Sequence, residues 1–312
     1  MRCPRCGTPP IMRGQKWCHM CGEQMKRGRW GEIVIALLKC LCYYLLYDII
    51  SGFMQTVYTA VVMGRTRALG YDVYVGEDYS PVFWQIFSEG YSGMMIFTYA
   101  LVFTAVLMWF LLRGKKPLHE MGIRRFRGSE LPGIVLFGLA AQAVTSITVS
   151  LVSVFTGPLG EETEQAYDSM FGDETSFAMF LFMAVATPII EELIFRGLIY
   201  TRMRSVMKPG AAVMLSALVF GLCHGEFYRV VYATLLGVLL AVFFERYNSL
   251  VPCIVLHAAF NSMSFIYEVL PESSLVFFSL YFISIGVTLI CMAYFFMSQP
   301  IYGKENQQNE TL

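Results

Sequence analysis

Residues 177–200 read FAMFLFMAVATPIIEELIFRGLIY, an apolar run of helical length with three charged residues in its second half. About 20 apolar residues cross the ~30 Å hydrocarbon core of a bilayer as a helix. The rest of the chain has the same character, because 56% of its 312 residues are hydrophobic and 15% are charged. Soluble domains carry about a quarter charged residues. This composition argues against a soluble enzyme and predicts an integral membrane protein.

Eight apolar spans are expected along the chain. The predicted fold class is therefore all-α, a polytopic membrane helix bundle of about eight transmembrane helices, preceded by a small zinc ribbon. The expected parts are the zinc ribbon at 1–24, a basic juxtamembrane linker at 25–31, a transmembrane core at 32–298 and a polar tail at 299–312. The predicted spans are 32–63, 92–112, 132–155, 177–200, 210–224, 229–244, 250–267 and 274–297.

Charge along the chain predicts its partners and its orientation. The 23 Lys and Arg residues balance the 23 Asp and Glu residues, so no nucleic-acid partner is expected. Basic residues gather in the head and in the loops after the second and fourth spans, whereas the loop at 156–176 carries acidic residues and no basic one. The positive-inside rule then predicts that both termini are cytosolic.

The head contains two Cys-x-x-Cys pairs, formed by Cys3 with Cys6 and by Cys18 with Cys21. Two such pairs so close together favour tetrahedral ligation of a structural Zn by four thiolates. A disulfide or a redox pair is the alternative, and it fits two matched pairs poorly. A segment of about 24 residues cannot bury a core of its own, so metal binding would supply its folding free energy.

Three charged residues of the fourth span form the first candidate group. Glu192 and Arg196 are four residues apart on a helix, so the sequence predicts an ion pair between them. Glu191 lies about 100° away around the helix and is left for another partner. A charge cluster at an interfacial, frayed helix end is the alternative interpretation.

Two histidines and an asparagine form the second group. His257 and Asn261 share one face of the seventh span, and His224 ends the fifth. Gly221 and Gly225 bracket His224 as Gly-x-x-x-Gly, a spacing that lets another helix approach closely. Polar groups inside a membrane are costly and need a partner or a purpose. Each histidine taken alone is also compatible with an ordinary buried core residue.

Together these groups resemble the three motifs of the CPBP family of intramembrane proteases, which includes type II CAAX prenyl proteases and bacterial Abi relatives. The matching motifs are Glu191-Glu192-x-x-x-Arg196, Phe220-x-x-x-His224 and His257-x-x-x-Asn261. The resemblance covers residues 132–297 and implies hydrolysis of a peptide bond within the membrane, near its cytosolic face. It also implies a multi-pass protein of a bacterial plasma membrane.

The resemblance implies a role for each residue of these motifs. Glu191 would be the general base that activates water and His224 would help to hold that water, while His257 and Asn261 would stabilise the oxyanion. Glu192 and Arg196 would be structural and orienting. A metal mechanism is the other possibility, with Glu191, His224 and His257 as ligands of a catalytic ion.

Other function classes stay open from the sequence. A non-enzymatic membrane adaptor or immunity-type protein would use the ribbon to bind a protein partner. An ion-coupled transporter would use Glu191 and the histidines as a proton relay, but no internal repeat supports it. The partners expected for the protease are membrane lipid and a peptide or protein substrate, lipidated or not.

Overall fold

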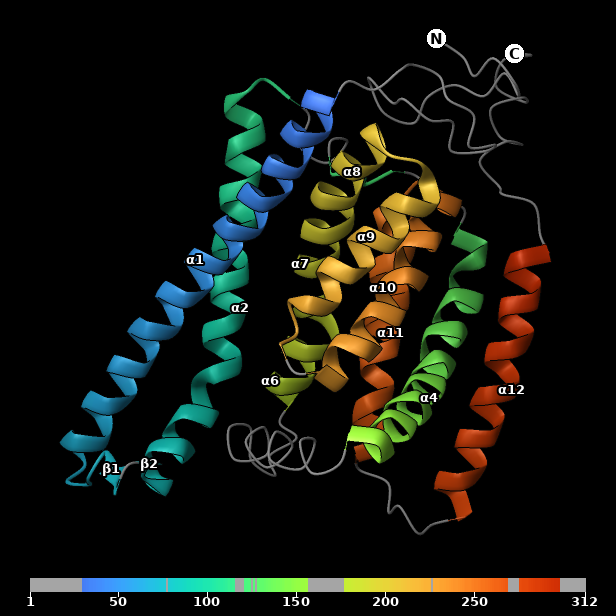
Figure 1. The fold of residues 1–312 in the computed structure, drawn as a ribbon. Coiled ribbons are helices and arrows are strands. Elements are labelled where there is room, and N and C mark those ends of the chain that lie inside the picture. Colours follow the sequence, from blue (N-terminus) through green and yellow to red (C-terminus); the bar gives the residue numbers. More distant parts are fainter. Residues whose placement is uncertain are drawn as a thin grey trace.

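The computed structural model describes residues 30–76, 78–115, 121–124, 126, 128–156, 177–225, 227–268 and 275–297. The described chain is a bundle of helices, as expected, and each of the eight predicted spans coincides with a helical segment (Figure 1). These segments are α1 (Trp30–Ala68), α2 (Pro81–Leu112), α4 (Leu131–Thr156), a composite helix at 177–206, α9 (Pro209–Leu222), α10 (Phe227–Tyr247), α11 (Leu250–Glu268) and α12 (Leu275–Met297).

Six of these segments are long and apolar enough to cross a membrane, and α9 and α11 are shorter apolar helices. The second predicted span was too short, because α2 begins eleven residues earlier than expected, at Pro81, where Ser80 caps its first turn. A short β-hairpin that the sequence did not predict precedes α2. Its two strands, of two residues each, are β1 (Tyr74–Val75) and β2 (Asp78–Tyr79). The chain is an integral membrane protein.

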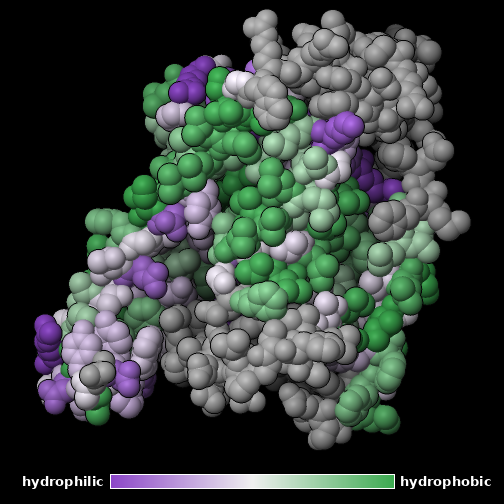
Figure 2. All heavy atoms as spheres, in the orientation of Figure 1, coloured by the Kyte–Doolittle hydropathy of each residue, from purple (hydrophilic) through white to green (hydrophobic). Residues whose placement is uncertain are grey.

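The α1–α2 pair leans away from the rest of the bundle (Figure 1). Large apolar side chains on α1 face outward, with Ile49 and Phe53 each 66% exposed, as expected for contact with lipid. Figure 2 shows apolar residues over the middle of the coloured surface and hydrophilic residues at the end of the α1–α2 pair that carries β1 and β2. On the other side of the composite helix, α4 packs against α11 and α12, and α9 packs against α10.

The composite helix forms the centre of the fold and changes pitch along its length. It consists of α6 (Phe177–Phe180), the π-helical segment η2 (Leu181–Ala186), α7 (Thr187–Glu192), the π-helical segment η3 (Leu193–Tyr200) and α8 (Thr201–Val206). π-Helical turns are rare and occur frequently at functional sites. Here they flank the short segment that carries both candidate glutamates.

Pro188 explains the first change of pitch. The Thr187 N–H bonds to the Phe182 carbonyl, five residues back, and Pro188 has no N–H to donate. The Met183 carbonyl therefore receives no hydrogen bond from the backbone of residue 187, its α-helical donor, or of residue 188, its π-helical donor. The side chain of Asn261 on α11 supplies the missing donor, with its Nδ2 2.8 Å from the Met183 oxygen.

Basic and polar residues are fixed at the end of the bundle where α8 ends and α9 begins. Arg204 is fully buried and donates from Nε to Glu245 Oε1 at 2.6 Å, and the same oxygen accepts the Tyr200 hydroxyl. Arg246 donates to the Phe295 carbonyl on α12 at 2.6 Å. The start of α1 and the end of α12 lie at this same end of the bundle (Figure 1).

Candidate active site

The two glutamates of α7 have different surroundings. Glu192 is fully buried, and its Oε1 accepts hydrogen bonds from Arg196 Nη1 at 2.7 Å and from His257 Nδ1 at 3.0 Å. Arg196 also donates to the Gly237 carbonyl at 3.3 Å and lies over the Phe220 ring. The ion pair expected from the four-residue spacing is therefore present. It is part of a buried network rather than a frayed interfacial cluster.

His257 connects the two glutamates. Its ring is 3% exposed, with Nδ1 on Glu192 and Nε2 3.8 Å from Glu191 Oε2. A carboxylate oxygen accepts and does not donate, so Nδ1 carries the proton of this hydrogen bond. Nε2 is then directed toward Glu191, which keeps a side chain that is 16% exposed.

His224 lies two residues beyond the end of α9, so the predicted fifth span, which ended at His224, extended two residues too far. The helix ends at Leu222, and the chain reverses through Gly225, whose φ of +80° belongs to the left-handed region that glycine favours. His224 Nδ1 lies 2.8 Å from the Phe220 carbonyl. A carbonyl only accepts, so Nδ1 is protonated and the Nε2 lone pair is available to a water or a substrate.

The turn that carries His224 depends on Gly221. A Cβ at Gly221 would lie 2.0 Å from Thr234 Oγ1 and 2.7 Å from the Val230 carbonyl, so α10 approaches this position closely, as the Gly-x-x-x-Gly spacing suggested. At Gly225, by contrast, nothing lies within 4 Å. Only the first glycine of that pattern is a packing residue.

Gly221→Ala is expected to force α9 and α10 apart and to lower the free energy of unfolding by about 1–3 kcal/mol, the usual cost of overpacking. The melting midpoint of the purified protein in detergent measures this loss. Gly286→Ala on α12 is the matched control, because a Cβ there meets nothing within 4 Å. Equal midpoints for both variants would contradict the close packing of α9 on α10.

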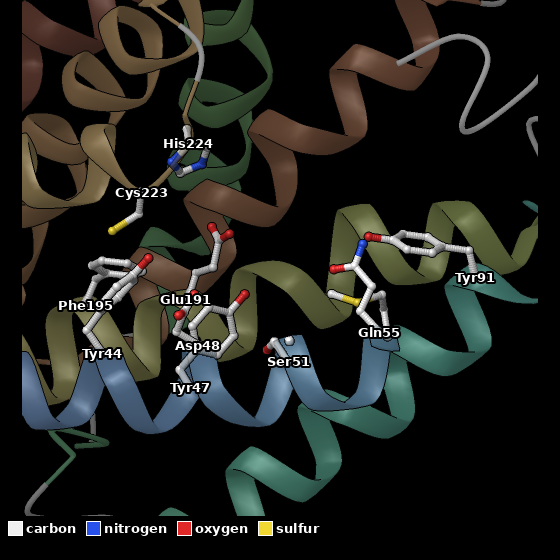
Figure 3. A pocket seen from close by; sticks show the side chains of 12 residues that line it. Tyr44, Tyr47, Asp48, Ser51, Gln55, Tyr91, Glu191, Phe195, Cys223 and His224 are labelled. Carbon is white, nitrogen blue, oxygen red and sulfur yellow. The ribbon is translucent and has the colours of Figure 1, made fainter. Parts of the chain in front are cut away.

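A cavity of about 300 Å³ joins Glu191 and His224. Figure 3 shows both side chains on one wall and residues of α1 on the other. His257 and Asn261 do not line this cavity, because His257 lies behind the glutamates and Asn261 bonds to the Met183 carbonyl. The lining residues are Tyr44, Tyr47, Asp48, Ser51, Gly52, Gln55, Tyr91, Met95, Glu191, Phe195, Cys223 and His224.

A comparison with family models matches residues 173–263 to the Rce1-like type II CAAX prenyl endopeptidases. The matched segment includes the composite helix, α9, α10 and most of α11, and with them all six residues of the predicted catalytic set. Over residues 173–263 the chain is therefore similar to the CPBP family, to which these peptidases belong. No curated protein and no solved structure matches the chain.

The segment matched to this family forms only one wall of the cavity. The other wall comes from α1 and α2, which precede the matched residues. Sequence reasoning missed this wall, although a signal was present in the polar residues Tyr44, Asp48, Ser51 and Gln55, which recur along one face of an apolar span. Periodicity shows that such a face exists but does not show which helix it meets.

A catalytic metal held by Glu191, His224 and His257 was the other possibility considered from the sequence. In the part of the chain that the structure describes, no three His, Cys, Asp or Glu side chains are grouped so that they could hold a metal ion. Cys3, Cys6, Cys18 and Cys21, the predicted zinc ligands, lie outside the described residues.

Proposed function

We propose that this protein is an intramembrane endopeptidase that hydrolyses a peptide bond with water activated by Glu191. The family match supports a CAAX-type peptidase at the family level. The observation that carries the assignment is the position of Glu191, which borders the cavity with His224 and lies 3.8 Å from His257. Glu192 is not available to activate water in this way, because its Oε1 already accepts hydrogen bonds from Arg196 and His257.

The proposed reaction begins with a water held between Glu191 and the Nε2 lone pair of His224. Glu191 accepts a proton as the water oxygen bonds to the scissile carbonyl carbon. The carbonyl oxygen becomes an oxyanion, which His257 stabilises when its Nε2 is protonated. Glu191 then returns the proton to the leaving amine as the carbon–nitrogen bond breaks.

Asn261 is better supported as a positioning residue than as an oxyanion donor. Its amide satisfies the Met183 carbonyl that Pro188 leaves without a helical donor. This bond fixes the π-helical segment η2 directly before α7, and α7 carries both glutamates. Asn261 therefore acts on Glu191 through the backbone of the composite helix.

The buried network of Glu192, Arg196 and His257 supplies the rigidity that the reaction needs. Fixed hydrogen bonds hold the imidazole of His257 in one orientation before the substrate arrives, so little reorganisation is needed in the transition state. A substrate entering the cavity would meet Glu191 and His224 first, because these two side chains line it. The substrate we propose is a membrane-associated peptide or protein, lipidated or not.

We infer that the end of the bundle where α1 begins and α12 ends faces the cytosol. The basic loop after α2 follows a helix that ends there, and Arg202, Arg204 and Lys208 belong to α8 and the residues directly after it, which also lie at that end (Figure 1). Reporters test this orientation. A fusion after Leu312 is expected to report the cytosol, and an insertion between residues 161 and 173 the opposite side. Two reporters on the same side would overturn the orientation.

We propose that the head binds one structural Zn through its four cysteines, with a protein partner as its further role. Purified full-length protein is expected to contain about one Zn per chain, and Cys6→Ser is expected to lose most of it, because three thiolates leave the tetrahedral site incomplete. Cys42→Ser, on an exposed cysteine of α1, is the matched control. Protein without Zn, or equal Zn in both variants, would contradict the zinc head.

A further inference from the structure

One helix outside the segment matched to the peptidase family presents a polar stripe to the cavity. Tyr44, Tyr47, Asp48, Ser51 and Gln55 follow one another at helical spacing on α1, and all five line the cavity opposite Glu191 (Figure 3). The neighbouring face of the same helix is apolar and exposed. The stripe is therefore the side of α1 that faces the site. The hydrolysis proposed above uses none of its residues.

Contacts of the residues that precede Asp48 on α1 fix this wall in place. Cys40 Sγ lies 3.5 Å from the Ile199 carbonyl of η3. The Tyr44 hydroxyl lies against the Cys223 thiol, next to His224 (Figure 3). The Tyr47 ring packs at 6.4 Å from that of Tyr99 on α2. These contacts hold α1 against the core without using the Asp48 carboxylate.

Asp48 has no cationic partner among the described residues. No described Lys or Arg forms an ion pair with it, and its side chain is exposed in the cavity wall. It lies midway along α1, 18 residues after Trp30 and 20 before Ala68. A carboxylate at such a depth in a membrane is costly, and such residues commonly mark a substrate path.

The charge balance of the cavity indicates what would pair with Asp48. The twelve lining residues include two carboxylates, those of Asp48 and Glu191, and no Lys or Arg. The cavity is therefore electronegative, and it attracts a positive group while disfavouring a negative one.

On the basis of the proposed peptidase function, we infer that Asp48 is a specificity-determining residue that binds a Lys or Arg side chain of the substrate next to the scissile bond. A cavity of about 300 Å³ is at the small end of ligand pockets, with room for one long side chain beside the reacting amide. The cation would form a charge-assisted hydrogen bond with Asp48. Ser51 and Gln55 would meet the adjoining peptide groups of the substrate.

A peptide series tests this inference on the full-length protein in liposomes. The parent is a farnesylated CAAX peptide with Gln directly before and directly after the farnesylated cysteine, and variants carry Lys or Glu at one of those two positions. Wild type is expected to cleave the best Lys peptide with a kcat/KM about tenfold or more above that of the Gln parent, the scale of a hydrogen bond to a charged group. The gain is expected in KM.

Asp48→Asn is expected to reduce the Lys-to-Gln ratio to near one, and Asp48→Lys to favour Glu over Lys. Asp72→Asn, which removes an exposed carboxylate between α1 and β1, is the matched control and is expected to keep the ratio. If wild type cleaves the Gln parent but shows no Lys preference, or if Asp48→Asn keeps that preference, the role of Asp48 is overturned and the peptidase stands. If wild type cleaves no peptide of the series, the proposed peptidase function and the role of Asp48 are both overturned.

Discussion

Glu192→Gln is expected to lower the melting midpoint and the yield of inserted protein, because it leaves the Arg196 guanidinium buried without its counter-charge. Arg196 is 1% exposed, and its other described contacts are the Gly237 carbonyl and the Phe220 ring. Removing one member of a buried ion pair costs about 3–5 kcal/mol. Gln keeps an oxygen that accepts from His257, so the change acts mainly on charge.

Arg196→Gln is expected to have a similar effect, because it leaves the Glu192 carboxylate buried and uncompensated. The double variant is expected to recover part of the loss, since two neutral amides remove the unpaired charge. Glu89→Gln, on an exposed position of α2, is the control for removing a carboxylate elsewhere. If the decrease in melting midpoint of the double variant equals the sum of the decreases of the two single variants, the two residues do not stabilise the fold as a pair.

Hydropathy located the eight helical segments in the described part of the chain, because each has to present an apolar surface to lipid or to its neighbours. The four-residue spacing of Glu192 and Arg196 likewise predicted their ion pair. These features depend on residues close in the sequence, which explains why a single sequence was sufficient for them.

The features that sequence reasoning missed depend on contacts between distant segments. The π-helical segment η2 follows from Pro188 together with a donor from Asn261, 78 residues from its acceptor. The end of α9 before His224 reflects the turn through Gly225 into α10, inside an apolar run that hydropathy treats as continuous. The role of α1 as a cavity wall depends on where this helix docks, and no local pattern records that.

Glu191→Gln is expected to reduce turnover by about 10²–10⁴-fold, the usual contribution of a general base, while the protein stays folded. Gln preserves the size of the side chain and removes its ability to accept the proton of water. Glu191 forms no ion pair with Lys or Arg among the described residues, so this variant leaves no buried cation unpaired. Its melting midpoint is therefore expected to stay close to that of wild type.

The most direct test of this mechanism is the initial rate of cleavage of a farnesylated CAAX peptide by equal amounts of folded wild type, Glu191→Gln and Glu89→Gln in liposomes. We expect Glu89→Gln to match wild type and Glu191→Gln to lose at least about a hundredfold in rate with an unchanged melting midpoint. A folded Glu191→Gln protein that cleaves the peptide at a near-normal rate would contradict the assignment of Glu191 as the base.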